Sequence, residues 1–326
     1  MLTYGSLASG VGGLDRAVEA VFHTRQIWHS EIDKQAIKIH ETHWEDVPNI
    51  GDIKTVDWSS IGRPDIICGG YPCQPFSTAG PRKGFDDPRN LWPYFADAIR
   101  ILRPRLVILE NVSAHLSSGF DRVLGDLAKM GYDAGWGVFK AADAGTPHRR
   151  ARLFIVAYPH SERELQPQGI VGEIRRWIDY GREESVADPG STTGREKRGK
   201  ASGSETENGE DASNGLESGS VVASDSGSEG CEGGGGTELR LDGDGLTNWG
   251  KYTPAVDRWT RITRQAPPKP MEGKRLNPEF TEWMMGLPIG WTEGVSTTAR
   301  LKCLGNGVVP QQGELAIRTL LDRRFG

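Results

Sequence analysis

Short apolar strands alternate with helix-like stretches along the first 158 residues, and this alternation limits the fold more than any other feature. We expect strands near 3–8, 26–30, 65–69, 105–110, 134–140 and 152–158, and helices near 12–22, 33–43, 91–102 and 119–130. Strands that alternate with helices form βαβ units, in which the strands are parallel and helices cover both faces. The sequence therefore predicts an α/β fold with a largely parallel sheet.

The composition changes after Pro159, and residues 185–247 consist mainly of Gly, Ser, Glu and Asp. A segment with so few large apolar side chains cannot offset the entropy of ordering its backbone, so we expect a low-complexity linker there. Aromatic residues return near Trp249, and an amphipathic helix is predicted over 310–322. The chain thus divides into an α/β domain at 1–158, a variable region at 159–275 that contains the insert, and a C-terminal segment at 276–326.

The formal net charge of −5 is unevenly distributed along the chain. Residues 201–247 contain eleven acidic residues and one Arg, a net charge of −10. Without them, the 39 basic residues fall to 38 and the 44 acidic residues fall to 33, which leaves +5 for the rest of the chain. A moderately basic body is compatible with contacts to nucleic-acid phosphates.

The four cysteines lie far apart, with no clustering of the kind that binds metals. With no N-terminal signal peptide, this pattern predicts reduced thiols in a cytoplasmic protein that holds no metal. No apolar stretch approaches the length of a membrane span, so we expect no membrane association.

One cysteine directly follows a predicted strand. The run 65–71 ends in two glycines and a tyrosine, and Pro72-Cys73-Gln74-Pro75 comes next. Catalytic groups in open α/β sheets gather on loops beyond the carboxyl ends of strands, so Cys73 is a candidate nucleophile. A buried structural thiol is the alternative, because free cysteine is among the most buried residue types.

Other predicted strand ends carry glycines, acids and arginines. The turn at 9–13 is rich in glycine, which lets the backbone approach a ligand closely. Glu31 follows about 20 residues later, where adenosine-binding folds place a carboxylate on the ribose. Each group alone also fits a tight turn, a helix cap or a solvated surface. The remaining strand-end groups are Asp52, Glu110, the arginines at 149–152 and a Gly/Asn turn at 304–310.

Taken in order, these motifs resemble those of the cytosine-5 DNA methyltransferase family, of the bacterial or phage Dcm-like type, over residues 1–158 and 272–326. The family's order is a Gly-rich cofactor loop, a ribose acid, a further acid, Pro-Cys-Gln, Glu-Asn-Val, Arg-x-Arg, a variable target-recognition region and a closing Asn-Gly turn. All eight occur here in that order. The resemblance implies a Rossmann-like S-adenosylmethionine-dependent methyltransferase sheet with helices on both faces, plus a small irregular target-recognition domain at 159–275.

The resemblance also implies roles for single residues. Cys73 matches the nucleophile, Glu110 the acid that contacts the cytosine, and Arg150 with Arg152 the pair that orients the base and the backbone. The segment 74–89 resembles a mobile loop that closes over DNA. The residues that match contacts to the methyl donor S-adenosylmethionine are Gly10, Gly12, Leu14, Glu31, Ile32, Asp52, Ile53, Pro72, Leu91 and Asn306.

The chain departs from the family pattern at two positions. Ala8 stands where an aromatic residue commonly stacks on the adenine, so that contact must come from elsewhere. His148 stands where glutamine is common, and a neutral imidazole can still donate one hydrogen bond.

The resemblance implies double-stranded DNA as partner, a monomeric enzyme and, as an open question, a cognate restriction endonuclease. RNA cytosine-5 methylation and a catalytically silent DNA-binding module remain as alternatives. An adenine or exocyclic-amine methyltransferase is disfavoured, because it needs no cysteine and uses an Asp/Asn-Pro-Pro-aromatic loop that this sequence lacks. We expect sequence recognition from 160–184 and 246–275, with candidate contacts at Arg175, Arg176, Trp177, Lys251, Arg258 and Arg261.

Overall fold

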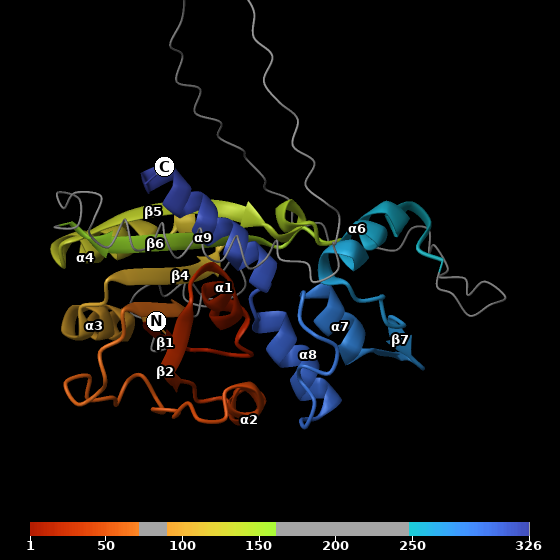
Figure 1. Cartoon of the computed structure of the whole chain (residues 1–326), viewed down its shortest axis with the longest axis horizontal. Coiled ribbons are helices and arrows are strands. Elements are labelled where there is room, and N and C mark those ends of the chain that lie inside the picture. The colour runs from red at the N-terminus through yellow and green to blue at the C-terminus, as the bar shows by residue number, and fades with distance from the viewer. Residues whose placement is uncertain (72–89, 161–247, 326) are drawn as a thin grey trace, which may run out of the picture.

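The structure is a computed structural model and describes residues 1–71, 90–160 and 248–325. A six-stranded sheet forms its centre, in the order β2-β1-β3-β4-β6-β5 (Figure 1). Strands β2, β1, β3 and β4 pair in parallel, and β6 pairs antiparallel with both β4 and β5. The predicted largely parallel sheet is confirmed. Its strands are β1 (Leu2–Leu7), β2 (Thr24–Ser30), β3 (Ile66–Gly70), β4 (Leu106–Val112), β5 (Tyr132–Lys140) and β6 (Ala151–Pro159).

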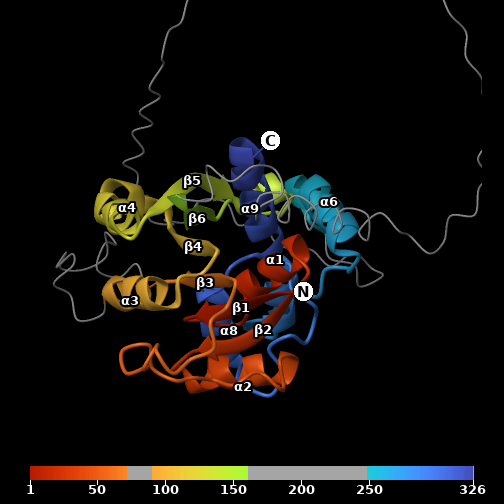
Figure 2. The same cartoon turned by 60° about the vertical axis from the view of Figure 1, so that its left-hand side comes forward.

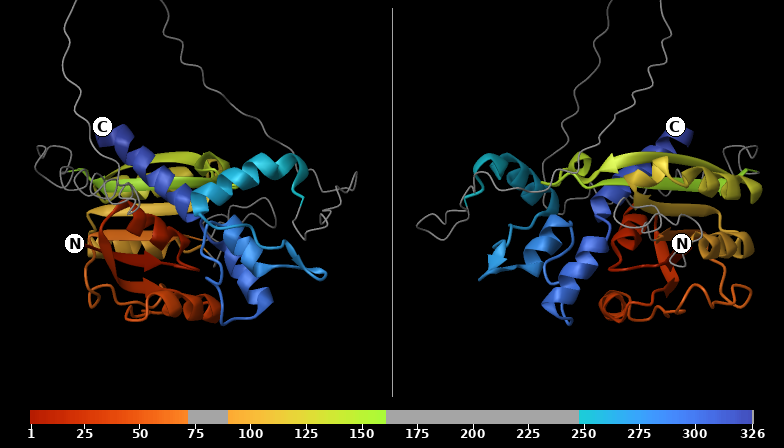
Figure 3. Two further views of the ribbon diagram at one scale, coloured as in Figure 1. Left: turned by 45° about the vertical axis from the view of Figure 1, so that its right-hand side comes forward. Right: turned by 180° about the vertical axis from the view of Figure 1, so that it is seen from behind.

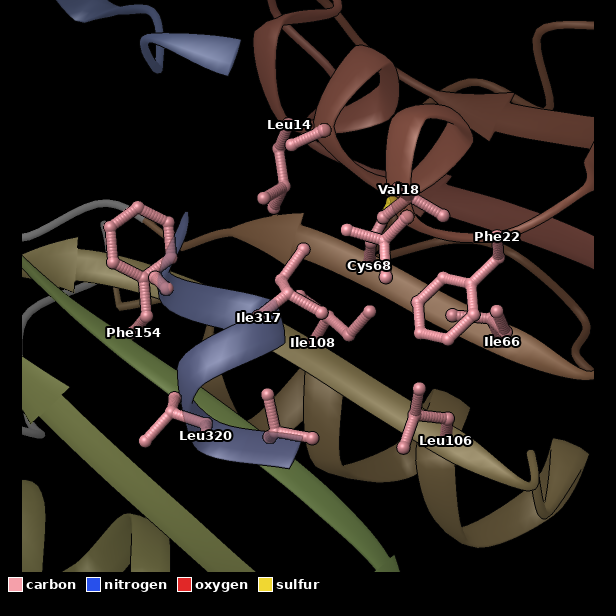
Figure 4. Close-up of a cluster of buried hydrophobic side chains, with 14 of the residues drawn as sticks. Leu14, Val18, Phe22, Ile66, Cys68, Leu106, Ile108, Phe154, Ile317 and Leu320 are labelled. Atoms are coloured by element: carbon pink, nitrogen blue, oxygen red, sulfur yellow. The ribbon is translucent and has the colours of Figure 1, made fainter. Parts of the chain in front are cut away.

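Alternate residues of each strand feed two separate apolar layers. In β4, Leu106 and Ile108 face one layer, and Val107 and Leu109 face the other. Helices α1 (Gly13–Val21) and α9 (Pro310–Phe325) cover the first layer, where Val18 and Ile317 pack over Ile108 (Figure 4). Helices α3 (Trp92–Leu102) and α4 (Phe120–Lys129) cover the second. Each fully buried aliphatic side chain contributes roughly 1.5 to 3 kcal/mol, so both faces are held firmly.

A third cluster lies at one end of the sheet, where α6 (Thr253–Thr263), α7 (Pro278–Met284) and α8 (Thr297–Asn306) are grouped (Figure 1; Figure 2 shows α6 and α8 from a second direction). The indole N–H of Trp259 in α6 donates to the Trp283 carbonyl in α7 at 2.7 Å. Buried contacts therefore continue across residue 275, where the sequence suggested a boundary. The short hairpin β7 (Met271–Glu272) and β8 (Arg275–Leu276) connects the two helices. None of the helices in the described ranges is both long enough and apolar enough to cross a bilayer.

Helix α2 (Lys34–His43) begins at a side-chain cap and packs against this cluster through its apolar face. The Asp33 side chain caps the helix by accepting from the backbone N–H of Gln35 at 2.9 Å. Ala36 and Ile39 are buried in the same cluster as α8. Within the described ranges, the remaining helical elements are the short 3₁₀ turns η2 (Ser113–Ser117), η3 (Ala141–Ala144) and η5 (Gly250–Tyr252).

The end of the chain returns to its beginning. Helix α9 lies against α1, and the segment before α9 runs past the first turn of α1 (Figure 3). A Cβ atom at Gly13 would lie 2.1 Å from the Val308 carbonyl oxygen. Only glycine permits this approach, so residues about 300 apart in sequence meet at one edge of the sheet.

Replacing Gly13 by alanine should destabilise the protein by about 1 to 3 kcal/mol, because the new methyl group would push the backbone at Val308 away. Urea unfolding monitored by circular dichroism measures this change. Gly125→Ala is the matched control, since Gly125 lies inside α4 with no atom within 4 Å of the new Cβ. That variant should gain about 0.5 to 1 kcal/mol. Equal effects of both substitutions would contradict the close packing at Val308.

Candidate active site

The chain changes direction after β1 in a glycine turn, where several residues adopt the left-handed backbone conformation. Ala8, Gly10 and Gly12 have φ values of 51°, 57° and 78°. A Cβ atom at Gly10 would meet no atom within 4 Å, whereas one at Gly12 would lie 2.4 Å from the Trp44 ring. The backbone at Gly10 is therefore open to a ligand, and Gly12 serves the packing of the turn.

Glu31 follows β2 and fixes the glycine turn through its carboxylate. One oxygen accepts from the Gly10 N–H at 2.9 Å, and the other accepts from the N–H groups of Ile32 and Asp33 at 2.8 and 2.9 Å. Two carboxylate oxygens offer about four acceptor positions, so Glu31 can also accept from a bound hydroxyl group. Asn49 binds the Glu31 backbone from the other side, by accepting from its N–H at 3.2 Å and donating to its C=O at 3.1 Å.

Glu110 lies on β4 directly opposite Gly70 of β3. A Cβ atom at Gly70 would lie 2.9 Å from a Glu110 carboxylate oxygen, so the glycine makes room for this side chain. The Arg152 Nε atom lies 3.0 Å from the other oxygen. Burial raises the pKa of Glu110 to about 7, against the opposing charges of Arg152 and Arg150. The site thus holds a carboxyl group that is part neutral and part ionised near pH 7.

Asn111, the next residue of β4, holds the end of β3. Its Nδ2 atom donates to the Tyr71 carbonyl at 3.1 Å, and both residues are buried. Tyr71 is two residues before Cys73. The predicted nucleophile Cys73, Pro72 and the loop 74–89 lie outside the described residues, and the structure therefore describes the strand end that leads to them.

The predicted Asn-Gly turn lies at the end of α8. Asn306 is the last residue of that helix, and the guanidinium group of Arg150 donates to the carbonyls of Gly305, at 2.9 Å, and Gly307. Arg150 has a φ of 34°, and burial lowers its pKa to about 10. Its side chain is thus engaged in holding the Asn306 turn.

These elements enclose a cavity of about 320 Å³. Its wall combines a backbone turn, carboxylates and a guanidinium group, which suits a polar ligand that carries hydroxyl and amide groups. The lining residues are Ala8, Gly10, Glu31, Asp33, Ala36, Gly70, Tyr71, Glu110, Asn111, Val112, Arg152, Lys302, Cys303, Gly305, Asn306 and Gly307. Five predicted site residues are among them: Gly10, Glu31, Glu110, Arg152 and Asn306.

The other predicted site residues within the described ranges do not line the cavity. The side chains of Leu14 and Ile53 are buried in the two apolar layers, and Leu91 packs against one of them, so their side chains do not face the cavity. Arg150 does not line it either, and its Nη2 atom donates to the Asn306 turn. Asp52 caps its own turn by accepting from the Lys54 N–H. Ile32 is 67% exposed beside Glu31.

The two departures from the family pattern have different structural settings. Ala8 lines the cavity without an aromatic ring. His148 does not line it, and its Nε2–H donates to the Met284 carbonyl at 2.9 Å, which joins the segment before β6 to α7. The imidazole therefore donates one hydrogen bond, and it does so to a backbone carbonyl.

Sequence reasoning missed four side chains that line the cavity at α2 and α8: Asp33, Ala36, Lys302 and Cys303. Lys302 forms an ion pair with Asp33 at 2.8 Å, and Cys303 lies beside Lys302. Asp33 lies two residues after Glu31, and Cys303 directly precedes the Gly/Asn turn, so closeness to these motifs was the available signal. Residues 33 and 302 are far apart in sequence, and packing in the third cluster brings α8 beside α2.

Of the candidate recognition contacts, Arg175, Arg176 and Trp177 lie outside the described residues. Arg258 donates to the Gly145 carbonyl at 3.2 Å, and Arg261 donates to the Asp257 carbonyl at 3.3 Å within its own helix. Lys251 lies 5.3 Å from the ring centre of Tyr252. Arg258 thus anchors α6 to the turn after η3.

Comparison with known proteins gives matches in sequence and in fold. The Type II methyltransferase M1.ScrFI of Lactococcus lactis subsp. cremoris is 37% identical over 157 residues, which cover 47% of this chain and 40% of that protein. The first matches of this kind span between 39% and 58% of the relatives' own length, so the chain spans about half the length of the curated relatives it matches.

Two solved structures match over almost the whole chain and show the same fold. The Schizosaccharomyces pombe Dnmt2 methyltransferase has a TM-score of 0.57 at 15% identity, with 99% of each chain covered. A putative DNA modification methyltransferase from an Escherichia coli prophage has a TM-score of 0.55 at 18% identity, with 99% of this chain and 100% of that chain covered. The family model described as C-5 cytosine-specific DNA methylase matches residues 2–321. The chain therefore belongs to the C-5 cytosine-specific DNA methylase family.

Proposed function

We propose that this protein is a DNA (cytosine-5)-methyltransferase that transfers a methyl group from S-adenosylmethionine to carbon 5 of a flipped cytosine in duplex DNA. One observation carries the proposal: Glu110, with its raised pKa and its contact to Arg152, lies opposite the strand end that leads to Cys73. An acid, a cation and a thiol are the groups that this reaction requires around one pyrimidine ring.

The cavity fits an adenosine-type methyl donor. The open backbone at Gly10 leaves room for the ligand, and Glu31 retains acceptor positions for ribose hydroxyl groups. Asn306 faces the same cavity from α8. When bound there, S-adenosylmethionine supplies an electrophilic methyl group.

Carbon 5 of cytosine is a weak nucleophile, and the thiolate of Cys73 activates it by adding to carbon 6. The electron pair of the 5,6 double bond then becomes available at carbon 5, which forms the new carbon–carbon bond as the methyl–sulfur bond breaks. Loss of the carbon 5 proton restores the double bond and expels the thiolate. The cytosine must leave the duplex to reach these groups, at a cost of roughly a few kcal/mol.

Glu110 and Arg152 stabilise the charge that develops on the ring. With a pKa of about 7, a protonated Glu110 can donate a hydrogen bond to ring nitrogen 3, while its carbonyl oxygen accepts from the exocyclic amine. Arg152 lies 3.0 Å from Glu110 and lines the same cavity, so it can donate to the carbonyl oxygen of the base.

The names of the curated relatives, all Type II methyltransferases, support DNA over RNA as the substrate. The intact set of Glu110, Asn111 and Arg152 favours an active enzyme over a silent binding module. The proposal includes a monomer acting on DNA in the cytoplasm, with residues 159–275 as the target-recognition region. It leaves open a cognate restriction endonuclease.

Cys73→Ser should abolish methyl transfer while the protein still binds duplex DNA. Tritium transfer from labelled S-adenosylmethionine measures the first property, and bisulfite sequencing of DNA from expressing cells identifies the target. Wild-type protein should also form a stable covalent adduct with DNA that contains 5-fluorocytosine. Full activity of the serine variant, or preference for transfer RNA in a competition assay, would overturn the assignment.

Glu110→Gln should lower the single-turnover rate by about a hundredfold or more, because the amide cannot supply the carboxyl proton. Binding of S-adenosylhomocysteine should change little, which isothermal titration calorimetry checks. A wild-type rate in this variant would remove Glu110 from the mechanism.

Arg152→Met should raise the pKa of Glu110 above about 7, because the guanidinium charge opposes the effect of burial. Carbon-13 NMR titration of labelled glutamate measures the shift, and the exposed Arg149→Met is the matched control. Since the folded-state pKa of Glu110 exceeds its ordinary value of 4.5, its contribution to wild-type stability is complete below that pH and is lost as the pH rises through about 7. A Glu110 pKa unchanged by Arg152→Met would contradict this electrostatic coupling.

A further inference from the structure

Three aromatic rings from β2 and α2 form a stack beneath the glycine turn. The rings of His29 and His40 lie 3.8 Å apart at an angle of 11°, and those of His40 and Trp44 lie 4.4 Å apart at 23°. Both histidines are fully buried. None of the three residues lines the cavity, so any effect on a ligand must pass through their neighbours.

Both ends of the glycine turn, at Ser9 and Gly12, lie against this stack. The hydroxyl oxygen of Ser9 lies 3.1 Å from Nδ1 of His29, within hydrogen-bond distance. At the other end, the position of a Cβ atom on Gly12 lies 2.4 Å from the Trp44 ring. Gly10, whose backbone opens into the cavity, lies between these two contacts.

His29 also holds the second loop beside the cavity, through its backbone. Its N–H donates to the Pro48 carbonyl at 3.1 Å, and its carbonyl accepts from the Ile50 N–H at 2.8 Å. These bonds fix Asn49, which binds the backbone of Glu31. His29 therefore supports the glycine turn through its ring and the Asn49 loop through its backbone. The Asn49 loop in turn fixes Glu31, whose carboxylate binds the glycine turn.

The stack is uncharged at neutral pH. Burial lowers the pKa of His29 to about 4 and that of His40 to about 3. The ionisable groups around the stack come from α1 and α2: Asp15, Arg16, Glu19 and His43. Asp15 is joined to His40 through Gln26, whose Nε2 atom donates to Asp15 at 2.9 Å and lies 3.4 Å from His40 Nε2. Neutral rings can stack closely without mutual charge repulsion.

We propose that His29 is a positioning residue for the methyl donor: its ring, stacked on His40, holds Ser9 and thereby keeps the glycine turn in its ligand-binding shape. This inference rests on the proposed function, because it takes the glycine turn as the donor site. The imidazole acts through Ser9 and touches no substrate.

Removing the ring nitrogen should weaken binding of S-adenosylhomocysteine by about threefold to tenfold, the effect of one hydrogen bond. His29→Phe keeps an aromatic ring in the stack and loses only the contact to Ser9. Ser9→Ala removes the same contact from the other side. Calorimetric titration should give similar losses for both variants and no further loss for the double variant, because they break one interaction.

A structural role alone would not produce two further results. His29→Asn places a polar atom where Nδ1 lies, one bond beyond Cγ, and should recover part of the affinity that His29→Phe loses. His29→Phe should also raise the KM for S-adenosylmethionine and leave kcat at saturation nearly unchanged. His160→Phe, a change of the same type at an exposed position directly after β6, should affect neither constant.

Hydrogen exchange of the ligand-free protein tests the inference without the proposed function. The amide of Gly12 donates to the Ser9 carbonyl and that of Gly10 to Glu31, and both should exchange faster in His29→Phe than in wild type. Unchanged exchange and unchanged affinity in this variant would overturn the positioning role. Failure of the wild-type protein to bind S-adenosylhomocysteine would instead overturn the proposed function, and the exchange result would still decide whether His29 supports the turn.

Discussion

The parallel pairing of β3 with β4 sets the geometry on which the site depends. Register places Gly70 opposite Glu110, and the absence of a side chain at Gly70 leaves space for the carboxyl group. Asn111 then ties the end of β3 to β4 through the Tyr71 carbonyl. A shift of one residue in this register would turn Glu110 to the opposite face of the sheet, because side chains alternate along a strand. The apolar layers on both faces therefore fix the position of the acid as firmly as they fix the strands.

Closure of the chain on itself supplies the other half of the cavity. Asn306, Lys302 and Cys303 come from α8, which packs in the third cluster, and the segment after α8 passes Gly13 at close range. Arg150, directly before β6, links that strand to the same turn. These contacts join residues that are distant in sequence, so the cavity forms only in the fully assembled fold.

The elements of residues 1–158, with their order, and helix α9 could be predicted from the sequence, because strand and helix periodicities are local signals and polar residues at strand ends are visible in the chain. Helices α6, α7 and α8 were not predicted. The placement of Gly10, Glu31, Glu110, Arg152 and Asn306 around one cavity followed from that order together with the family resemblance. The direction of a side chain could not be predicted in the same way. Arg150, directly before β6, and Arg152, within β6, were given one role, yet one holds a turn and the other contacts Glu110.

The same limit applies to residues whose partners come from another element. Asn49 has no motif around it, and its role appears only when its loop lies beside β2. His29 lies in β2 and His40 in α2, so no periodicity within a single element relates the two rings. Contacts of this kind depend on how α2 packs against the sheet, and this packing depends in turn on Ala36 and Ile39 in the third cluster.

Burial has opposite consequences at the two polar centres of this protein, and each suits its position. At Glu110 it raises the pKa toward neutrality, so that one carboxyl group can exist in both protonation states beside an arginine. Beneath the glycine turn it lowers the pKa of two histidines, so that both remain neutral and can stack. In both cases loss of solvent disfavours the charged form. The carboxyl group of Glu110 can therefore change its charge near pH 7, whereas the imidazole rings of His29 and His40 stay neutral there.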